Sequence, residues 1–566
     1  MKKFWGKLEE LLEKNQNSFK KNELNNIRGE IFRQCALCSQ NDKGFFELCV
    51  PTGGGKTLSS LRFAVGHAKK HNLDRIIFII PFLNILEQNA KVVKELLDKN
   101  GLNSKSYVLE SHSNVINEDY QKNNQAETDY KVSEFYNNWD EPIVFTTMVQ
   151  FLENVYAGGT NAVRRFHNMA NAVLIFDEIQ ALPIKCIYMF NLLVKFLVYF
   201  ANSTVLLCSA TQPPLSQLES EMSLPVATKI VAKNYPILKR TRIINKVDVC
   251  NGSSYDEIAD FALQCAKDKG SCLVVVNTKS SVTKIFQLLK ESTILVYCLT
   301  TNLCAEHRSE IIDEIKAKLK NKEQIICVST SLIEAGVDID FASVIRFIAG
   351  IDNIIQSAGR CNREGKLADS QGNKILGDVY LFYNKNESIG KLEEIKQAQD
   401  FIIETLHYGE VDFFSEKIIE KYYKNKFKNN KQKFDYPIKD FNGTSQIELL
   451  STNDKLCSNA INRTEIGPIF ASFKTAGQNF KVIDNDQISV IVPYRTGKEI
   501  IEAIRNNQFD VLKKAQRYTV NIYTNNLSRM NEAVEDLGHG IFALKSGFYH
   551  DDLGVQAEFV NQNQIY

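Results

Sequence analysis

The sequence contains no stretch of about 18 uncharged apolar residues, which is the length that a membrane-crossing helix requires. Its first residues, Met1-Lys2-Lys3, lead into a charged segment instead of the apolar core of a signal peptide. These absences argue against membrane and secretory classes, so we expect a cytoplasmic protein with no membrane partner. The 13 cysteines agree with this, because they are spread through the chain as is usual in a reducing compartment.

A zinc-binding framework is also missing. Cys35 and Cys38 form one CxxC pair, but no second pair stands at the spacing of a zinc site. The pair lies in the segment RQCALC, whose helical periodicity favours two core residues over two metal ligands.

The chain has no excess of charge of either sign, since 68 Lys and Arg residues oppose 67 Asp and Glu residues, for a net charge of +1. This balance does not exclude a nucleic-acid partner, because phosphate contacts need a local basic groove and not a basic total. One candidate strip spans residues 417–433, where lysines surround Tyr422, Tyr423 and Phe427, which could stack on bases. A solvated linker helix would have much the same composition, so both interpretations stay open.

The most informative feature that is present is the glycine-rich segment VPTGGGKT at residues 50–57, which follows an apolar run and precedes an amphipathic helical pattern. A strand that turns through glycines into a helix presents backbone N–H groups and a helix dipole to an anion. Lys56 can then reach the β- and γ-phosphates of ATP, and Thr57 can bind Mg²⁺. The strict pattern has glycine in place of Val50, so a simple glycine turn is the alternative. The expected ATP contacts of the loop are Thr52, Gly53, Gly54, Gly55, Lys56 and Thr57.

Two carboxylates follow the apolar strand pattern of residues 172–176. Asp177 is placed to bind Mg²⁺ beside the phosphates, and Glu178 to orient and deprotonate a water. An acidic pair after a strand is also common by chance, so the interpretation depends on the motifs that follow.

Three further segments fall where apolar strand patterns end. Ser-Ala-Thr occupies residues 209–211, VSTSLIEAGVDIDF residues 328–341, and QSAGRCNREG residues 356–365. In the last segment Arg360 and Arg363 stand three apart, and we expect them on one face of a helix. An arginine that reaches the phosphates from a second domain raises the rate of phosphoryl transfer about 10³–10⁵-fold. The alternative is that both are surface residues of a helix in an inactive ATPase.

Between about Arg28 and about Asn384, this order of motifs resembles that of superfamily 2 helicases. The resemblance implies that two domains share one ATP·Mg²⁺ and that each supplies part of the hydrolytic machinery. It assigns hydrolysis to Lys56, Asp177, Glu178, Gln356, Arg360 and Arg363, nucleotide contacts to Gly336 and Asp338, metal binding to Thr57 and Asp177, and coupling to Gln180, Ser209 and Thr211. Many members have histidine where Gln180 stands. No clear adenine-reading glutamine precedes the loop, where Arg28 or Gln34 could substitute.

Four more segments are similar to one branch of this superfamily, the CRISPR-associated signature helicases of type I interference, and are closest to the C subtype. They are residues 67–90, 110–114, 299–308 and 513–523, and SATQPP at residues 209–214 carries the same resemblance. The resemblance implies a 3′–5′ DNA helicase or translocase that is driven by ATP, stimulated by single-stranded DNA and recruited by a guide-RNA surveillance complex. The alternatives are an RNA or general DNA helicase of superfamily 2 and, in another class, a non-catalytic module that recruits a nuclease.

Full-length members of this branch resemble helicases fused to an N-terminal HD nuclease, whose metal site begins with a His-Asp pair. Here a short leader precedes the helicase motifs, and the eight histidines are scattered. His550-Asp551 has no neighbouring histidines, so we expect a polar turn there and not a metal site. We therefore expect the HD nuclease to act in trans or to be missing from this sequence.

Candidate contacts to DNA phosphates lie in other strand-end segments. They are Pro81, Asn84, His112, Thr146 and Thr147 in the first domain, and Asn277, Thr278, Thr300 and Thr330 in the second. The alternative for these residues is the capping of local turns, and for Thr146, Thr147 and Thr278 the two interpretations are equally weighted.

Apolar strand patterns alternate with helical ones twice along the chain, which predicts two doubly wound parallel sheets. The expected fold class is α/β, with two tandem RecA-like domains, a helical linker and a small α+β C-terminal domain. The expected strands are residues 76–80, 143–146, 172–176 and 204–208 in the first domain, and 272–276, 294–298, 324–328 and 344–347 in the second. The expected boundaries are a leader helix at 1–24, domain 1 at 25–232, domain 2 at 241–384, linker helices at 385–433 and an accessory domain at 434–566. Ligands of such sheets bind beyond the carboxyl ends of the strands, where all the motifs above fall.

Overall fold

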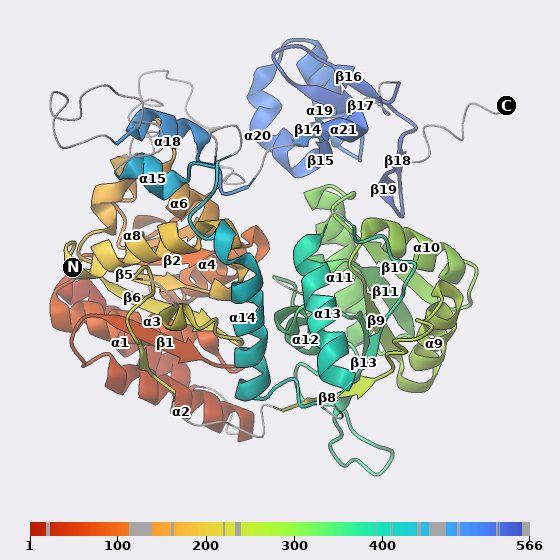
Figure 1. Ribbon diagram of the computed structural model, residues 1–566, viewed down its shortest axis with the longest axis horizontal. Coiled ribbons are helices and arrows are strands. Elements are labelled where there is room, and N and C mark those ends of the chain that lie inside the picture. The colour runs from red at the N-terminus through yellow and green to blue at the C-terminus, as the bar shows by residue number, and fades with distance from the viewer. Residues whose placement is uncertain are drawn as a thin grey trace. The chain divides into compact units, whose positions relative to one another are not determined.

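The computed structural model describes residues 1–18, 23–51, 53–112, 138–159, 164–218, 221–231, 239–334, 336–390, 392–407, 409, 411–438, 443–451, 471–483, 487–527, 530 and 532–556. The chain divides into two compact units (Figure 1). Unit 1 consists of Met1–Leu238 and Ser415–Ile483, and unit 2 of Lys239–Phe414 and Asp484–Tyr566. The chain therefore leaves unit 1 once, returns to it at Ser415 and leaves it again after Ile483.

Unit 1 is built on a seven-stranded sheet in which every neighbouring pair is parallel, in the order β3-β4-β2-β5-β6-β1-β7. The strands are β1 (Phe45–Cys49), β2 (Arg75–Ile80), β3 (Val108–Ser111), β4 (Ile143–Thr147), β5 (Ala172–Phe176), β6 (Thr204–Ser209) and β7 (Thr228–Lys229). All residues of β4, β5 and β6 are buried. Because both faces of these strands are covered, their sequences are nearly continuous apolar runs.

Different helices cover the two faces of this sheet (Figure 1). One core contains residues of α1 (Lys2–Asn17), α2 (Glu23–Cys38), α3 (Lys56–His71) and α4 (Leu83–Asp98). The core on the other face contains residues of α6 (Met148–Tyr156), α8 (Ile187–Tyr199) and the returning segment, which includes α14 (Glu416–Asn430), α15 (Gln446–Leu450) and α18 (Phe473–Asn479). Cys35 is buried in the first core, as the helical periodicity of its segment predicts.

Unit 2 contains a six-stranded sheet that is also parallel throughout, in the order β10-β11-β9-β12-β13-β8. The strands are β8 (Thr241–Asn245), β9 (Ser271–Val275), β10 (Leu295–Leu299), β11 (Ile325–Ser329), β12 (Ser343–Phe347) and β13 (Gly377–Phe382). The helices are α9 (Tyr255–Lys269), α10 (Lys279–Leu289), α11 (Ala305–Lys320), α12 (Ile351–Ala358) and α13 (Glu393–His407). Residues of α9 and α10 pack on one face of the sheet, and residues of α11 and α12 on the other.

The C-terminal part of unit 2 adds a small mixed sheet in the order β15-β14-β17-β16. Its elements are β14 (Gln487–Ile491), α19 (Gly497–Arg505), α20 (Leu512–Ala515), β15 (Thr519–Tyr523), α21 (Thr524–Leu527), β16 (Val534–Asp536) and β17 (Phe542–Leu544), followed by a hairpin of β18 (Tyr549–His550) and β19 (Gly554–Val555). The backbone N–H of Val555 donates to the carbonyl oxygen of Asn302 at 3.0 Å. Gly554 has a φ of 68°, and a Cβ there would lie 2.2 Å from the same carbonyl oxygen, so the hairpin contacts the 302–304 loop closely enough to require glycine.

These sheets confirm the expected fold class. The eight expected strands in the two large sheets are all present, but the patterns do not predict β3, β7, β8 or β13. One expectation is wrong: α12 ends at Ala358, and the bridge between Phe341 and Cys361 prevents the helix from continuing. Arg360 and Arg363 therefore lie in the turn after the helix and not on one helical face. Across the part of the chain that the structure describes, no helix is long and apolar enough to cross a membrane.

Candidate nucleotide and nucleic-acid site

The strand order of unit 1 brings three sequence motifs to one place. β6 lies between β1 and β5 in the sheet, although it follows both in the sequence. Because the strands are parallel, the segments that follow β1, β5 and β6 meet at the same edge. These segments carry the glycine-rich loop, the Asp177–Glu178 pair and the residues 209–211.

The glycine-rich loop has the backbone geometry of an anion site. Gly53 and Gly55 have φ values of 78° and 83°, which residues with a Cβ rarely adopt. Gly55 is the N-cap of α3, so the loop leads directly into a helix N-terminus. Arg28 stabilises this conformation, since its Nε and Nη2 donate to the carbonyl oxygen of Gly53 at 2.9 and 2.7 Å. Thr52 lies outside the described residues.

Lys56 lies between the two carboxylates of the acidic pair. Its Nζ is 2.7 Å from Oε1 of Glu178 and 3.6 Å from Oδ1 of Asp177. Burial alone would lower the pKa of Lys56, but the charges of Glu178 and Asp177 outweigh burial and raise this pKa above its ordinary value. Burial raises the pKa of Asp177, an effect that Lys56 opposes and Glu178 reinforces. Lys56 therefore stays charged, as a phosphate-binding lysine must.

Asn89, which the sequence motifs do not single out, joins the two residues expected to bind Mg²⁺. Its Oδ1 accepts from the hydroxyl of Thr57 at 2.9 Å, and its Nδ2 donates to Oδ2 of Asp177 at 3.4 Å. Hydroxyl and carboxylate oxygens are the protein ligands that Mg²⁺ prefers, so Thr57 and Asp177 suit this ion. The sequence could have pointed to Asn89, because it is a polar residue between Leu86 and Val93 on the buried face of an amphipathic helix.

A chain of hydrogen bonds connects the acidic pair to the end of β6. Gln180 donates from Nε2 to Oε2 of Glu178 at 2.5 Å, and its Oε1 accepts from the hydroxyl of Ser209 at 2.6 Å. The Ser209 hydroxyl in turn accepts from the backbone N–H of Thr211 at 2.9 Å. Glu178 has a φ of 51°, a left-handed backbone conformation that is uncommon for residues other than glycine and is often found at functional sites.

The other half of the same sheet edge is formed by β2, β4 and β3. Pro81 follows β2, and Asn84 is exposed in the first turn of α4. His112 follows β3, with its Nε2 3.5 Å from Oε2 of Glu110. The nucleotide motifs and these candidate DNA contacts therefore occupy two halves of one edge.

Three of the threonine candidates have hydroxyls that are engaged within the fold. The hydroxyl of Thr147 accepts from the backbone N–H of Gln150 at 3.1 Å and caps α6, and the hydroxyl of Thr146 donates to the Gln150 side chain at 2.9 Å. The hydroxyl of Thr278 accepts from the backbone N–H of Ser281 at 3.2 Å and caps α10. The structure therefore shows the capping alternative for Thr147 and Thr278, and a local side-chain bond for Thr146.

Asn277 is also engaged within its unit. Its Nδ2 donates to Oε2 of Glu387 at 2.8 Å and to the carbonyl oxygen of Ile348 at 3.1 Å. Its Oδ1 accepts from Nη1 of Arg346 at 2.7 Å. The amide is thus committed to the interior and is not available to a phosphate in this conformation.

The motif residues of unit 2 lie in the turns after β11 and α12, except for Gln356, which lies on α12. Arg360 is buried, and its Nε and Nη2 donate to the carbonyl oxygens of Ile333 and Glu334 at 2.9 and 2.6 Å. The carboxylate of Glu334 accepts from Nε of Arg346 at 2.9 Å, and both side chains are buried. Arg360 therefore fixes the backbone of this turn.

Arg363 is more accessible than Arg360. Its Nε lies 2.8 Å from Oδ1 of Asp338, and the two side chains are 24% and 59% exposed. Gly336 has a φ of 77° in the same segment, and Gln356 is half-buried on α12. The remaining candidates, Thr330 and Thr300, follow β11 and β10 at the carboxyl edge of the sheet.

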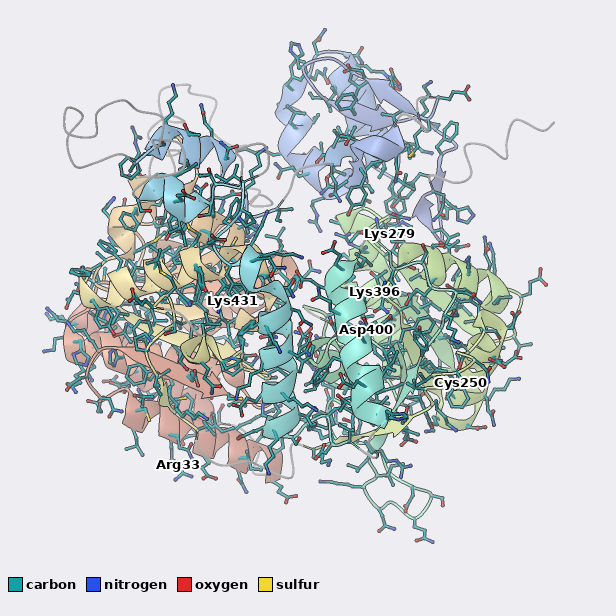
Figure 2. All side chains as sticks on the ribbon, in the orientation of Figure 1. Arg33, Cys250, Lys279, Lys396, Asp400 and Lys431 are labelled. Carbon is teal, nitrogen blue, oxygen red and sulfur yellow. The ribbon has the colours of Figure 1, made fainter. Side chains whose placement is uncertain are left out.

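Two further cations at this edge were not among the sequence candidates. Lys279 begins α10 (Figure 2), and its Nζ donates to Oδ1 of Asn302 at 2.7 Å. Nη1 of Arg308 donates to the carbonyl oxygen of Leu303 at 3.2 Å. Burial and the nearby charge of Arg308 lower the pKa of Lys279 to about 8. Within the described part of the chain neither cation has a carboxylate within ion-pair distance, so an anion would be a favourable partner for both.

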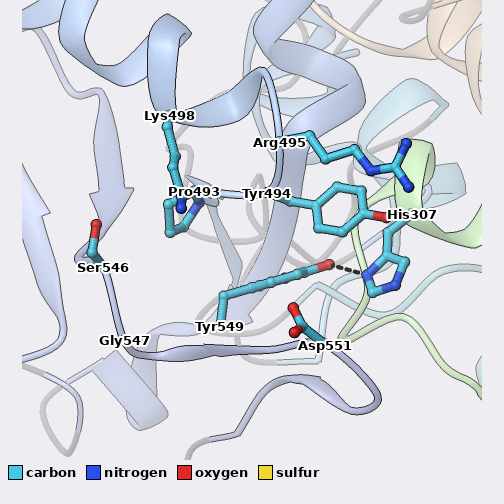
Figure 3. A pocket seen from close by; sticks show the side chains of 9 residues that line it. All are labelled: His307, Pro493, Tyr494, Arg495, Lys498, Ser546, Gly547, Tyr549 and Asp551. Carbon is cyan, nitrogen blue, oxygen red and sulfur yellow. Dashed lines mark hydrogen bonds between the residues drawn. The ribbon is translucent and has the colours of Figure 1, made fainter.

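A cavity of about 390 Å³ lies in unit 2 between the start of α11 and the C-terminal sheet (Figure 3). The ring of His307 stacks on Tyr494 with centroids 4.1 Å apart, and its Nδ1 is 3.0 Å from the hydroxyl of Tyr549. Burial lowers the pKa of His307. The lining residues are His307, Pro493, Tyr494, Arg495, Lys498, Ser546, Gly547, Tyr549 and Asp551. Because these include charges of both signs, the cavity does not select one class of ligand.

His550 and Asp551 lie in β18 and in the turn that follows it. The expected polar turn therefore holds for Asp551 only, because His550 belongs to the strand. In the ranges that the structure describes, no group of three His, Cys, Asp or Glu side chains is arranged to hold a metal ion.

Two sequence families match parts of the chain. Residues 268–366 match the family described as CRISPR-associated nuclease/helicase Cas3, C-terminal, and residues 9–213 match the family described as type III restriction enzyme, res subunit. A curated CRISPR-associated nuclease/helicase Cas3 from Methanothermobacter thermautotrophicus is 26% identical over 333 residues, or 56% of this chain and 38% of the relative. A second, from Haloferax volcanii, is 23% identical over 430 residues, or 58% and 46% of the two chains. The matched region thus spans less than half the length of either relative.

A solved structure also has a similar fold. The crystal structure of T. fusca Cas3 with AMPPNP matches 91% of this chain and 67% of its own, with a TM-score of 0.62 and 14% sequence identity. At this identity the likeness concerns the fold, and it agrees with the two large parallel sheets described above.

Proposed function

The chain resembles the Cas3-type helicases of superfamily 2 in sequence and in fold, and we propose that it is an ATP-dependent DNA helicase or translocase. The observation that supports this most directly is the arrangement of side chains in unit 1. Lys56 lies between Asp177 and Glu178, and Gln180 links Glu178 to the end of β6. This combination joins a phosphate site to a second structural element, as an ATPase that drives movement requires.

ATP hydrolysis is the chemical step of the proposal. The backbone N–H groups of the glycine-rich loop bind the phosphates, and Lys56 exchanges its two carboxylate partners for phosphate oxygens. The released Glu178 then orients and deprotonates the attacking water. Thr57 and Asp177 would hold Mg²⁺, which supplies neutralising charge to the phosphates.

Unit 2 supplies the second half of the catalytic machinery in this proposal. In this proposal Arg363 stabilises the charge on the phosphates in the transition state, as the resemblance implies, and contributes about 10³–10⁵ in rate. That factor corresponds to roughly 4–7 kcal/mol of transition-state stabilisation. We assign Arg360 to holding the turn that carries Gly336 and Asp338, because its guanidinium is buried against the carbonyl oxygens of this turn. Gln356 retains the role in hydrolysis that the resemblance implies.

Single-stranded DNA is the proposed second ligand. In unit 1 we propose contacts from Pro81, Asn84 and His112, at the half of the sheet edge away from the nucleotide. In unit 2, Thr300 and Thr330 remain candidates. Lys279 and Arg308 join them, because two half-buried cations without a described carboxylate partner favour a phosphodiester.

The biological setting comes from the resemblance. We propose that the protein acts in the cytoplasm in type I CRISPR interference, with a guide-RNA surveillance complex that exposes the DNA strand. Movement along this strand is 3′ to 5′. An HD nuclease, supplied in trans or by a part of the protein outside this sequence, cuts the strand, and no membrane takes part.

The test is the rate of ATP hydrolysis by the full chain with single-stranded DNA, with single-stranded RNA and with neither. We expect strong stimulation by DNA and weak stimulation by RNA. Lys56→Ala should abolish turnover while DNA binding is retained, because Lys56 lies in the nucleotide half of the edge. Equal stimulation by RNA would favour the general helicase, and no turnover under any condition would favour the non-catalytic recruiting module.

A further inference from the structure

The hydrogen bonds that begin at Glu178 do not end at β6. They pass through Gln180, Ser209 and the backbone of Thr211, as described above. The next partner is Tyr423, whose hydroxyl donates to the carbonyl oxygen of Thr211 at 3.2 Å. The nucleotide site is thus connected, bond by bond, to a side chain more than two hundred residues away in the sequence.

Tyr423 belongs to α14, and its bond to Thr211 is of interest because this helix directly follows the connection between the two units. The chain crosses from unit 2 to unit 1 between Phe414 and Ser415, and Ser415 is the N-cap of α14. α14 is therefore the first element of unit 1 after the chain returns. The N-terminal end of this helix is thus one of the points at which the chain joins the two units.

The burial of Tyr423 shows that its hydroxyl serves this contact and not a nucleic acid. Tyr422 and Tyr423 are only 4% and 2% exposed, and the Tyr423 ring packs 6.0 Å from the ring of Phe427, between centroids. Aromatic side chains in this position cannot stack on bases. The interpretation of residues 417–433 as a base-stacking strip is therefore wrong for its two tyrosines, which are buried, and Tyr423 instead contacts Thr211 of unit 1.

Gln212, next to Thr211, strengthens the case. Its side-chain oxygen and nitrogen are both buried, and neither finds a hydrogen-bond partner among the described residues. Buried amides are normally paired, so the Gln212 side chain adds no described hydrogen bond to those that hold this turn. The bond from Tyr423 is correspondingly important for the position of Thr211.

We propose that Tyr423 is a positioning residue that ties the turn at Ser209–Thr211 to α14, and so couples the position of the inter-unit connection to Glu178. The proposal rests on the proposed function, since it concerns how hydrolysis is linked to movement on DNA. When α14 shifts, the Thr211 carbonyl shifts with it, and Ser209 changes its bond to Gln180. Gln180 then changes the orientation of Glu178, the group that activates water.

The experiment replaces Tyr423 by Phe in the full chain, which removes the hydroxyl and keeps the buried ring. We measure ATP turnover with and without an oligo-dT single strand, and strand displacement per ATP hydrolysed. We expect basal turnover within about twofold of the wild type, and kcat with DNA lower by about three- to tenfold at unchanged KM for ATP. Loss of one intramolecular hydrogen bond changes an equilibrium constant by a factor in about this range.

Tyr156→Phe is the matched control, because it also removes a tyrosine hydroxyl that donates to a backbone carbonyl of unit 1, that of Met189 at 2.7 Å. Its DNA-stimulated kcat should equal that of the wild type. A second comparison adds Ser209→Ala, which cuts the same chain of bonds. If Tyr423 acts through this chain, Tyr423→Phe should lower coupling no further in the Ser209→Ala background, whereas independent effects would add.

Three outcomes would overturn these ideas in distinguishable ways. A wild-type enzyme that DNA does not stimulate overturns the proposed function, and the role of Tyr423 with it. A stimulated wild type with equal coupling in Tyr423→Phe and Tyr156→Phe overturns the role of Tyr423 alone. Full additivity with Ser209→Ala does the same, because it shows an effect outside the chain of bonds.

Discussion

Replacing Asn89 by Ala removes a side chain that contacts both expected Mg²⁺ ligands without itself binding the ion. The bond from Thr57 to Asn89, at 2.9 Å, contributes about 1 kcal/mol, and the longer bond from Asn89 to Asp177, at 3.4 Å, contributes less. A loss of about 1–2 kcal/mol corresponds to roughly a 5–30-fold decrease in an equilibrium constant. This overlaps with the decrease of about 10–100-fold in metal affinity that follows loss of such outer-shell partners. We therefore expect that Asn89→Ala needs about ten times more Mg²⁺ than the wild type to reach half of the maximal Mg²⁺-dependent binding of ADP.

The pH dependence of this defect gives a second, independent signature. The bond from Asn89 lowers the pKa of Asp177, which burial raises above its ordinary value. Without Asn89 the pKa of Asp177 rises further, so the carboxylate keeps its proton to a higher pH. Because Mg²⁺ binds only the deprotonated form, the affinity gap between variant and wild type should widen as pH falls.

The assay titrates Mg²⁺ against the binding of a fluorescent ADP and against thermal stabilisation by ADP, so that it does not depend on turnover. Gln88→Ala is the control, since Gln88 is the exposed neighbour of Asn89 on α4. ADP affinity without Mg²⁺ should be nearly unchanged in both variants. An Asn89→Ala protein with the Mg²⁺ dependence of the wild type at every pH would refute the assignment of Thr57 and Asp177 to the metal.

Two further predictions concern unit 2. Arg363→Ala should lower kcat at least about 10³-fold while ATP affinity stays within a few-fold of the wild type, because the arginine acts mainly in the transition state. Nucleotide-binding titrations measure the affinity, and single-turnover hydrolysis measures the rate of the chemical step. An unchanged turnover rate would contradict this role of Arg363. Lys279→Ala should weaken binding of single-stranded DNA and reduce the slope of log affinity against log salt by about 0.7. Since the pKa of Lys279 is about 8, the affinity of the wild type for DNA should also fall as pH rises through 8, and the variant should lose this dependence. Fluorescence-anisotropy titrations at several pH values and salt concentrations measure the pH dependence and the salt slope. Identical pH profiles of variant and wild type would exclude Lys279 from the DNA contact.

The sequence predicts those parts of the fold that are determined by residues close together in the chain. β5, for example, matches the predicted residues 172–176, because a strand buried on both faces must be a continuous apolar run. β3 has only four residues and β7 only two, so neither is long enough for a strand-like pattern of apolar residues to be recognised in the sequence. The end of α12 also escaped prediction, because a bridge between Phe341 and Cys361 ends the helix, and no local pattern specifies that pairing.

The candidate site divides in the same way. The spacing of glycines, Lys56 and Thr57 is a local motif, and a single loop fulfils it. Whether a polar side chain is available to a ligand depends instead on distant residues: Asn277 is engaged by Glu387, 110 positions away. Tyr423 lies 212 positions from its partner Thr211. Local sequence could therefore nominate candidates but could not show which of them the interior already uses.

Unit 1 thus offers two physical routes to the proposed nucleotide site, one from the proposed DNA-binding half of the sheet edge and one from the inter-unit connection. The first runs along α4, whose first turn carries Asn84 and whose next turns bring Asn89 to the metal ligands. The second runs from α14 through Tyr423 and the turn at Ser209–Thr211 to Glu178. Because the first route ends on the proposed Mg²⁺ ligands and the second on the proposed base, a displacement of α4 should change how tightly ATP·Mg²⁺ is held. A displacement of α14 should instead change whether the bound nucleotide reacts.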